Sequence, residues 1–278
     1  MMRRVAIAGR RYQVAGTAGD SYFHDAPHHA RGVRDLHAVA AAILPPDGMA
    51  IDIGANIGLT ALALAALLPA GRVVAVEPSP RTSEALRRTV AANPVGARIA
   101  VEACAVGAVP GEAVFHDAEH SAGSHLLADA TMRAAALSRV TVPVTTLDLL
   151  VEAHALSRLD FVKIDVEGFE TEVLDGGAEA IARFRPHVFV EFNAWTLLCN
   201  RNANPRAVIE DWLARFPVVH AIRGTTPPHR VAPDDALGFL HDHLVERRCA
   251  DDLVLGFDDA WLARWRAPAR RAAAKAKP

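Results

Sequence analysis

From about residue 46 onward, short apolar runs alternate with helical segments, and this alternation constrains the fold more than any other feature of the chain. Three of the apolar runs have the length of strands, and the segments between them have helical periodicity. The runs cover residues 49–54, 71–78 and 97–107, and the helical segments cover residues 57–69 and 79–94. Apolar strands that alternate with helices are typical of a parallel sheet covered on both faces. The sequence therefore predicts a doubly wound α/β fold.

The alternation is interrupted between about residues 107 and 158 and then resumes. Within the interruption we expect two extra antiparallel strands, at 111–117 and 139–148, with a polar loop and a weak helix between them at 118–137. The later strands are expected at residues 159–168, 186–193, 217–224 and 251–257, and the later helices at 169–184 and 205–216.

The two ends of the chain lack this pattern. Residues 1–45 predict a small N-terminal extension, with a hairpin around Gly9 and a helix over 35–44 that ends before two prolines. The last residues carry basic side chains and no acid, which predicts a flexible, solvated tail. We therefore divide the chain into an extension (1–45), a main domain (46–263) and a tail (264–278).

The composition argues against several classes of partner. A net charge of −2 and a pI near 6.7 give no electrostatic case for nucleic acid. The longest apolar run, residues 61–70, contains a proline and is shorter than the ~20 residues that span a membrane. The apolar run near the N-terminus is too short for a signal peptide. Three separated cysteines without a CxxC spacing favour a reducing compartment, so we expect a cytoplasmic protein.

A glycine turn follows the strand expected at 49–54. In "IDIGANIG", Gly54 and Gly58 lie between that strand and a helix, where backbone N–H groups can approach a ligand closely. The turn is not the GxGxxG dinucleotide fingerprint, because Asn56 occupies the second glycine position. Glu77 follows Gly58 by 19 residues and ends the next strand, where an acid can accept hydrogen bonds from both hydroxyls of a ribose. Together these features favour S-adenosylmethionine over NAD.

Several stretches, taken in order, resemble the FkbM-type methyltransferases. They are "IDIGANIGLT", "VVAVEPSP", "TLDLL", "FVKIDVEGFETEVLDGG" and "VFVEFN". The resemblance runs from about Met49 to Asn193 and leaves both ends of the chain uncovered. It implies the class I methyltransferase fold, a mostly parallel seven-stranded sheet whose last strand is antiparallel. It also implies S-adenosylmethionine as the methyl donor and a hydroxyl of a saccharide or natural product as the acceptor.

The resemblance also implies which residues bind the donor. They are Asp52, Gly54, Ala55, Asn56, Gly58, Glu77, Pro78, Cys104, Ala105 and Asp165. Asp52, Gly54, Asn56 and Gly58 would form the donor loop, Glu77 would hold the ribose, and Cys104 with Ala105 would lie along the adenine.

The strand "DFVKIDVEGFE" ends in carboxylates, which are costly at the end of a buried strand unless they are paired or used. In an open α/β sheet, ligands bind at the carboxyl ends of the strands. Asp165, Glu167 and, from the next strand, Glu191 are therefore expected to converge above the donor, with Lys163 on the same strand face as Asp165. We take Asp165 and Glu167 as catalytic candidates, since a positioned base accelerates proton removal by roughly 10²–10⁴-fold. Asp165 could instead be a structural, paired acid, and Glu170 could simply begin a helix.

Histidines offer further candidates. In the loop "HSAGSHL", His120 and His125 titrate near neutrality, and we include His125 among the catalytic residues. The histidine groups at 24–29 and 241–243 lack the spacing of a zinc site, so we expect no metal.

The sequence leaves alternative functions open. N-methylation of an amine is not separated from O-methylation by the sequence, whereas Asn56 argues against an oxidoreductase. The intact donor loop argues against a binding protein without catalytic activity. We expect a small-molecule or glycan acceptor, and the sequence leaves a homo-oligomer open.

Overall fold

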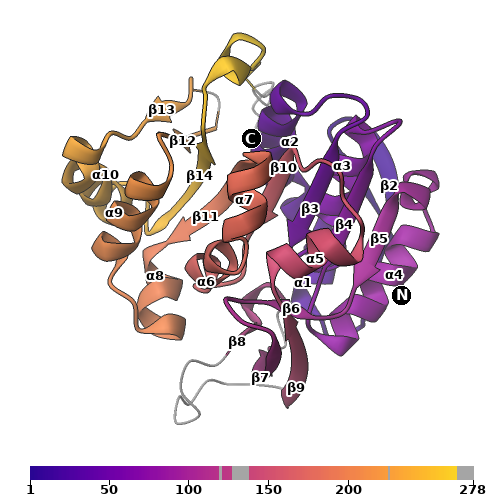
Figure 1. Cartoon of the computed structure of the whole chain (residues 1–278). Coiled ribbons are helices and arrows are strands. Elements are labelled where there is room, and N and C mark those ends of the chain that lie inside the picture. The colour runs from indigo at the N-terminus through magenta and orange to yellow at the C-terminus, as the bar shows by residue number, and fades with distance from the viewer. Residues whose placement is uncertain (119–120, 127–137, 225, 268–278) are drawn as a thin grey trace, which may run out of the picture.

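The computed structural model describes residues 1–118, 121–126, 138–224 and 226–267. A main sheet forms the centre of the molecule, and helices cover both of its faces (Figure 1). Its strands run in the order β13-β12-β14-β11-β10-β3-β4-β5. Their bounds are β3 (Met49–Ile53), β4 (Arg72–Val76), β5 (Ile99–Glu102), β10 (Phe161–Ile164), β11 (His187–Asn193), β12 (Val218–Ile222), β13 (His229–Arg230) and β14 (Ala250–Gly256).

The predicted doubly wound, mostly parallel sheet is confirmed. Strands β5, β4, β3, β10 and β11 pair in parallel, and the last strand, β14, lies antiparallel between β11 and β12. The expected number of seven strands is exceeded by one, because β13 adds a two-residue edge pairing to β12. The architecture is that of the class I methyltransferase fold.

Two separate apolar cores hold the helices on the sheet. On one face pack α2 (Ala26–Ile43), α3 (Leu59–Leu67) and α4 (Pro80–Ala91). On the other pack α5 (Leu147–Ala153), α6 (Glu170–Asp175), α7 (Ala178–Phe184), α9 (Pro205–Arg215) and α10 (Ala236–Val245). Neighbouring residues of the central strands enter opposite cores, as in Ile51 and Ala50 of β3.

Several element boundaries differ from those expected. The helix expected over 35–44 begins at Ala26, because Pro27 fits the first turn of a helix. The helix expected over 169–184 is divided into α6 and α7 at a pair of glycines. Gly176 ends α6, and a side chain there would collide with the carbonyl oxygen of Gly107, so the close approach of the two segments requires glycine. Helix α4 begins as predicted, with the Ser79 side chain accepting a hydrogen bond from the Thr82 N–H.

A small second sheet interrupts the alternation, as the sequence predicts. It contains β6 (Ala105–Val106), β7 (Gly111–Asp117), β8 (His125–Leu126) and β9 (Ser138–Thr145), in the order β6-β9-β7-β8. Strands β7 and β9 are antiparallel. The single strand expected over 97–107 is therefore wrong, because its end, β6, leaves the main sheet and pairs with β9. The weak helix expected within 118–137 lies largely outside the described residues.

The N-terminal hairpin forms as predicted, from β1 (Met2–Ile7) and β2 (Arg10–Ala15). It is bonded to the main domain, since the N–H of Ala15 donates to Thr89 Oγ1 and that of Gln13 to Asn93 Oδ1. The short helices are α1 (Ser21–His24), α8 (Ala194–Thr196), η1 (Pro94–Arg98), η2 (Ser121–Gly123), η3 (Leu197–Arg201), η4 (Pro233–Asp235) and η5 (Ala260–Ala263).

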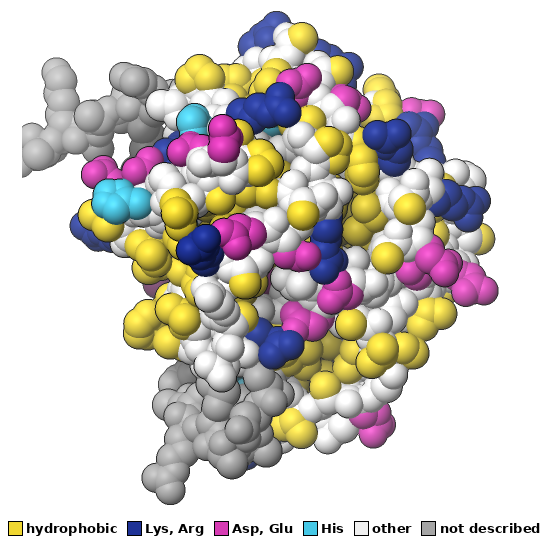
Figure 2. Space-filling model, turned by 60° about the vertical axis from the view of Figure 1, so that its left-hand side comes forward, with side chains coloured by type: hydrophobic (Ala, Val, Ile, Leu, Met, Phe, Trp, Pro, Cys, Tyr) yellow, Lys and Arg dark blue, Asp and Glu magenta, His cyan; other side chains and the backbone are white. Residues whose placement is uncertain are grey.

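Surface charge and hydropathy agree with the composition. In the described part of the chain, no helix combines the length and apolar character needed to cross a bilayer. Figure 2 shows acidic and basic side chains mixed over the face that it turns forward. Most of the expected basic tail, from residue 268 on, lies outside the described residues.

Candidate functional site

The glycine turn after β3 is fixed by its neighbours. The N–H groups of Gly54 and Ala55 both donate to the carbonyl oxygen of Val76, at 3.0 Å each, which fastens the turn to the end of β4. Gly54 has a φ of +76°, and a side chain there would collide with the carbonyl oxygen of Asp165. Glycine is therefore required at this position by the approach of the neighbouring strand end, besides any approach to a ligand.

Glu77 connects this turn to the start of α4. Its carboxylate is buried and accepts hydrogen bonds from the N–H groups of Asn56 and Ser79, both at 3.0 Å. Burial raises the pKa of Glu77 to about 7, although the two backbone hydrogen bonds favour the charged form. Each carboxylate oxygen retains a lone pair for a further donor.

The turn opens onto a pocket at the carboxyl ends of β3, β4 and β10. Eight of the ten expected donor-binding residues line it. They are Gly54, Ala55, Asn56, Glu77, Pro78, Cys104, Ala105 and Asp165. The other two, Asp52 and Gly58, do not. Asp52 is fully buried beneath the turn, where it accepts a hydrogen bond from Thr60 Oγ1 at 2.6 Å, and Gly58 precedes α3 with a φ of +96°.

Lys163 lies at the centre of this region and is buried. Its Nζ donates to the carbonyl oxygens of Ile53 and Gly54, at 3.1 and 2.7 Å. The same atom lies 3.4 Å from Asp52 Oδ1 and 3.5 Å from Asp165 Oδ2. Burial acts to lower the pKa of Lys163, but the carboxylates of Asp165 and Asp52 outweigh it, so the pKa is raised. Lys163 and Asp165 thus share a strand face, as their spacing predicts.

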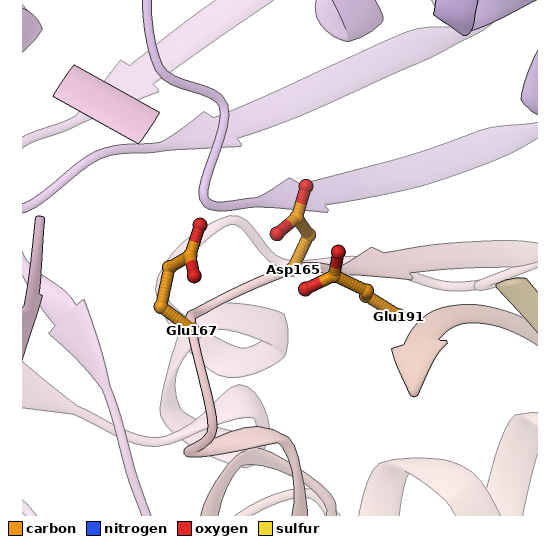
Figure 3. Close-up of side chains that lie close together, drawn as sticks. All are labelled: Asp165, Glu167 and Glu191. Carbon is orange, nitrogen blue, oxygen red and sulfur yellow. The ribbon is translucent and has the colours of Figure 1, made fainter. Parts of the chain in front are cut away.

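Three carboxylates meet beside the pocket. Asp165 and Glu167 follow β10, Glu191 lies on β11, and the three side chains point toward one another (Figure 3). One oxygen of each lies within 4.8 Å of the others. Burial and neighbouring acids, above all Asp165, raise the pKa of Glu167 and of Glu191 well above the usual range. Carboxylates at this spacing could also hold a metal ion, so the absence of a metal stays a prediction.

Glu170 has a different environment from these three acids. It is buried, and its Oε1 accepts hydrogen bonds from the N–H groups of Val166 and Gly168, both at 3.1 Å. Burial raises its pKa to about 7. Glu170 does not line the pocket, and its hydrogen bonds hold the turn that carries Glu167.

The structure does not bring His125 to these acids. Its ring packs edge-on against His116 in the small sheet, with 4.9 Å between ring centroids, and Nδ1 lies 3.0 Å from the carbonyl oxygen of Gly123. His125 is not among the residues that line the pocket, and burial lowers its pKa. His120 lies outside the described residues.

The N-terminal extension supplies lining that the sequence motifs did not predict. Tyr22 of α1 lines the pocket. Asp20 Oδ1 accepts from the N–H groups of Tyr22 and Ser121, at 3.0 and 3.2 Å, and Ser121 Oγ donates to Asn56 Oδ1 at 2.9 Å. The only signal of this arrangement in the sequence is Asp20 as a helix cap, which does not say where the helix lies.

A second cavity, of about 590 Å³, adjoins the first. The two share five lining residues, namely Tyr22, Thr60, Lys163, Asp165 and Glu167. Helix α2 contributes His28, His29, Arg31 and Arg34 to its lining, and strands β11 and β14 contribute Phe189, Glu191 and Asp252. Burial raises the pKa of Asp252 to about 7. The volume lies in the range of small-molecule sites.

Comparison with known proteins bears on this site. Residues 52–210, more than half of the chain, match the family described as the methyltransferase FkbM domain. Methyltransferase sdnD of Sordaria araneosa is 28% identical over 184 residues, which are 56% of this chain and 70% of that protein. Methyltransferase 1 of Beauveria bassiana is 29% identical over 152 residues, 49% of this chain and 60% of that protein. The crystal structure of methyltransferase FkbM from Methylobacillus flagellatus KT superposes with a TM-score of 0.47 at 17% identity, over 78% of this chain and 47% of that one.

Proposed function

Because the chain belongs to the FkbM methyltransferase family and is an S-adenosylmethionine-dependent methyltransferase, we propose that it methylates a hydroxyl oxygen of a saccharide or other natural-product small molecule. The observation that carries this proposal is a cluster of three carboxylates, Asp165, Glu167 and Glu191, where two cavities adjoin. One cavity has the features of a donor site, and the other is large enough for a small acceptor.

The first cavity fits S-adenosylmethionine by its chemistry. Glu77 offers two carboxylate oxygens to the ribose hydroxyls, beside the backbone turn of Gly54 to Asn56. Apolar side chains suited to a purine, including Pro78, Cys104 and Phe115, form another part of the lining. We assign Glu77 to the ribose and the turn to the amino acid part of the donor.

The chemistry requires a positioned oxygen and a proton acceptor. The bound donor supplies an electrophilic methyl group on a sulfonium; as the acceptor oxygen bonds to it, the methyl–sulfur bond breaks and its electron pair stays on sulfur. Asp165, in an ion pair with Lys163, accepts a hydrogen bond from the acceptor hydroxyl and orients it. Glu167 takes the proton, because its raised pKa makes it a stronger proton acceptor than an ordinary carboxylate.

N-methylation is the second candidate, and the same acids favour it. Three carboxylates with one neighbouring ammonium could attract a protonated amine. An amine must lose its proton before it attacks, so its methylation would rise with pH up to the pKa of the amine. Mass spectrometry of the product, with fragmentation that places the methyl group on oxygen or nitrogen, separates the two reactions.

Donor binding is tested first, by calorimetric titration with S-adenosylmethionine, S-adenosylhomocysteine and NADH. We expect both sulfur nucleosides to bind and NADH not to bind. Tight binding of NADH with no response to either sulfur nucleoside would refute the proposal.

A further inference from the structure

Glu191 has a carboxylate oxygen for which the fold provides no partner. Its Oε2 is buried, and in the described part of the chain no group donates a hydrogen bond to it. Glu191 lies on β11, opposite Asp252 of β14 in the strand register, and both residues line the second cavity. A buried acceptor without a donor is destabilising, so its presence beside a cavity calls for an explanation.

The neighbouring groups do not satisfy this oxygen. Lys163 forms its ion pairs with Asp52 and Asp165, and among the described residues neither Glu191 nor Glu167 forms an ion pair. The arginines that line the cavity, Arg31 and Arg34, lie on α2, where they form hydrogen bonds with His28 Nδ1 and the Arg31 carbonyl oxygen. The unmet acceptor, Glu191 Oε2, therefore lies next to the acids proposed to handle the acceptor hydroxyl.

The separation of these acids suits two neighbouring hydroxyl groups. One oxygen of Asp165, one of Glu167 and one of Glu191 lie within 4.8 Å of each other, so groups on adjacent carbons of one ligand can reach all three. Burial and the neighbouring acids raise the pKa of Glu191, and burial raises that of Asp252 to about 7, so this wall attracts an ammonium less than ordinary carboxylates would and suits a neutral polyol.

On the basis of the proposed function, we propose that the acceptor is a vicinal diol. One hydroxyl is oriented by Asp165 and gives its proton to Glu167 as it is methylated, and its neighbour donates a hydrogen bond to the Glu191 carboxylate. Glu191 is then a specificity-determining residue, which distinguishes a diol from the matching compound with one hydroxyl, because only the diol fills the unmet acceptor.

The test compares matched acceptors on the full chain. S-adenosylhomocysteine release from S-adenosylmethionine is measured with catechol and phenol, trans-1,2-cyclohexanediol and cyclohexanol, and methyl α-D-glucopyranoside with its 2-deoxy and 3-deoxy analogues. We expect transfer to diols, with kcat/KM at least about tenfold above that of the mono-ol, as for one hydrogen bond to a charged group. Glu191→Ala should abolish the preference, Glu191→Gln should restore part of it, and the exposed acid variant Glu84→Ala should leave it unchanged.

Stability separates this role from a structural one. Removal of an unsatisfied buried carboxylate should leave the free energy of unfolding of Glu191→Ala equal or higher, whereas loss of a structural acid should lower it. Equal use of diols and mono-ols, transfer to none of the diols, preference for trans-2-aminocyclohexanol over trans-1,2-cyclohexanediol, or loss of activity with EDTA that magnesium restores would each overturn the diol proposal. In all four cases S-adenosylmethionine still binds. Failure of the proposed function is recognised separately, because S-adenosylmethionine would then not bind.

Discussion

The ammonium nitrogen of Lys163 lies 2.7 Å from the carbonyl oxygen of Gly54, across two neighbouring parallel strands. The same nitrogen reaches Asp52 beneath the glycine turn and Asp165 at the strand end. One buried cation therefore fixes the turn proposed to bind the donor relative to the acid proposed to orient the acceptor.

Replacement of Lys163 should affect stability and donor binding together. Lys163→Met leaves Asp52 buried without its cation, which typically costs about 3–5 kcal/mol. We expect urea unfolding to show a loss of this order, and calorimetry to show weaker S-adenosylmethionine binding in the protein that still folds. The exposed Arg206→Met on α9 serves as the control. A folded Lys163→Met protein with unchanged donor affinity would contradict this role.

Glu77 is predicted to supply much of the ribose binding. Glu77→Ala removes a charged acceptor, for which hydrogen bonds contribute about 1.5–3 kcal/mol, so S-adenosylmethionine should bind roughly 10- to 100-fold more weakly. Glu77→Gln keeps one acceptor oxygen and should lose less. Calorimetry with Glu84→Ala as the control measures this, and unchanged affinity in Glu77→Ala would remove the assignment.

Asp165 and Glu167 should differ in their kinetic effects. Glu167→Gln removes the proton acceptor and should lower kcat by roughly 10²–10⁴-fold at equal donor occupancy. The rate of the unmodified enzyme should rise with pH through the raised pKa of Glu167, because the base must be deprotonated, and the variant should lose this rise. Asp165→Asn should mainly raise the KM for the acceptor. If Glu167→Gln retains both the rate and the pH profile, another group is the base.

Stability should fall as the pH rises toward neutrality. Burial raises the pKa of Glu77, Glu170 and Asp252 to about 7, from ordinary values of 4.5, 4.5 and 3.8. Between about pH 4 and pH 7 the folded state then binds more protons than the unfolded state, so the free energy of unfolding decreases with pH. Each unit of pKa difference corresponds to about 1.4 kcal/mol.

Glu170→Gln tests this pH dependence at one site. Glu170 Oε1 accepts both of its backbone hydrogen bonds, and glutamine can keep that oxygen in place. The slope of unfolding free energy against pH, measured in urea, should therefore be smaller in the variant. An unchanged slope would show that Glu170 does not titrate differently in the two states.

The N-terminal extension is predicted to take part in donor binding. Asp20→Ala removes the cap of α1 and the contact to Ser121, which together place Tyr22 over the donor pocket. Loss of a helix cap costs about 1 kcal/mol, and we expect S-adenosylmethionine affinity to fall several-fold. Asp25→Ala, at an exposed position in the same region, is the matched control, and equal donor affinity in the two variants would exclude the extension from the site.

Much of the fold and of the donor pocket could be predicted from local patterns. The apolar strands, the glycine turn and Glu77 all lie within the motif-bearing half of the chain, where spacing along the strand sets the position of each side chain. Because parallel strands end at one edge, Asp165, Glu167 and Glu191 could be expected to meet before their distances were known. The exit of β6 into the small sheet could not, since an apolar run does not reveal which sheet it joins.

What the sequence alone determined is thus the sheet, the family resemblance and the set of candidate acids. Tertiary structure decided which of these side chains face a cavity. It placed Tyr22 and α2 around the site, kept His125 against His116, and gave Glu170 two backbone donors while leaving Glu191 Oε2 with none. The reason is physical: periodicity fixes the face of a strand or helix, whereas the burial and the hydrogen-bond partners of a carboxylate depend on segments distant in the chain.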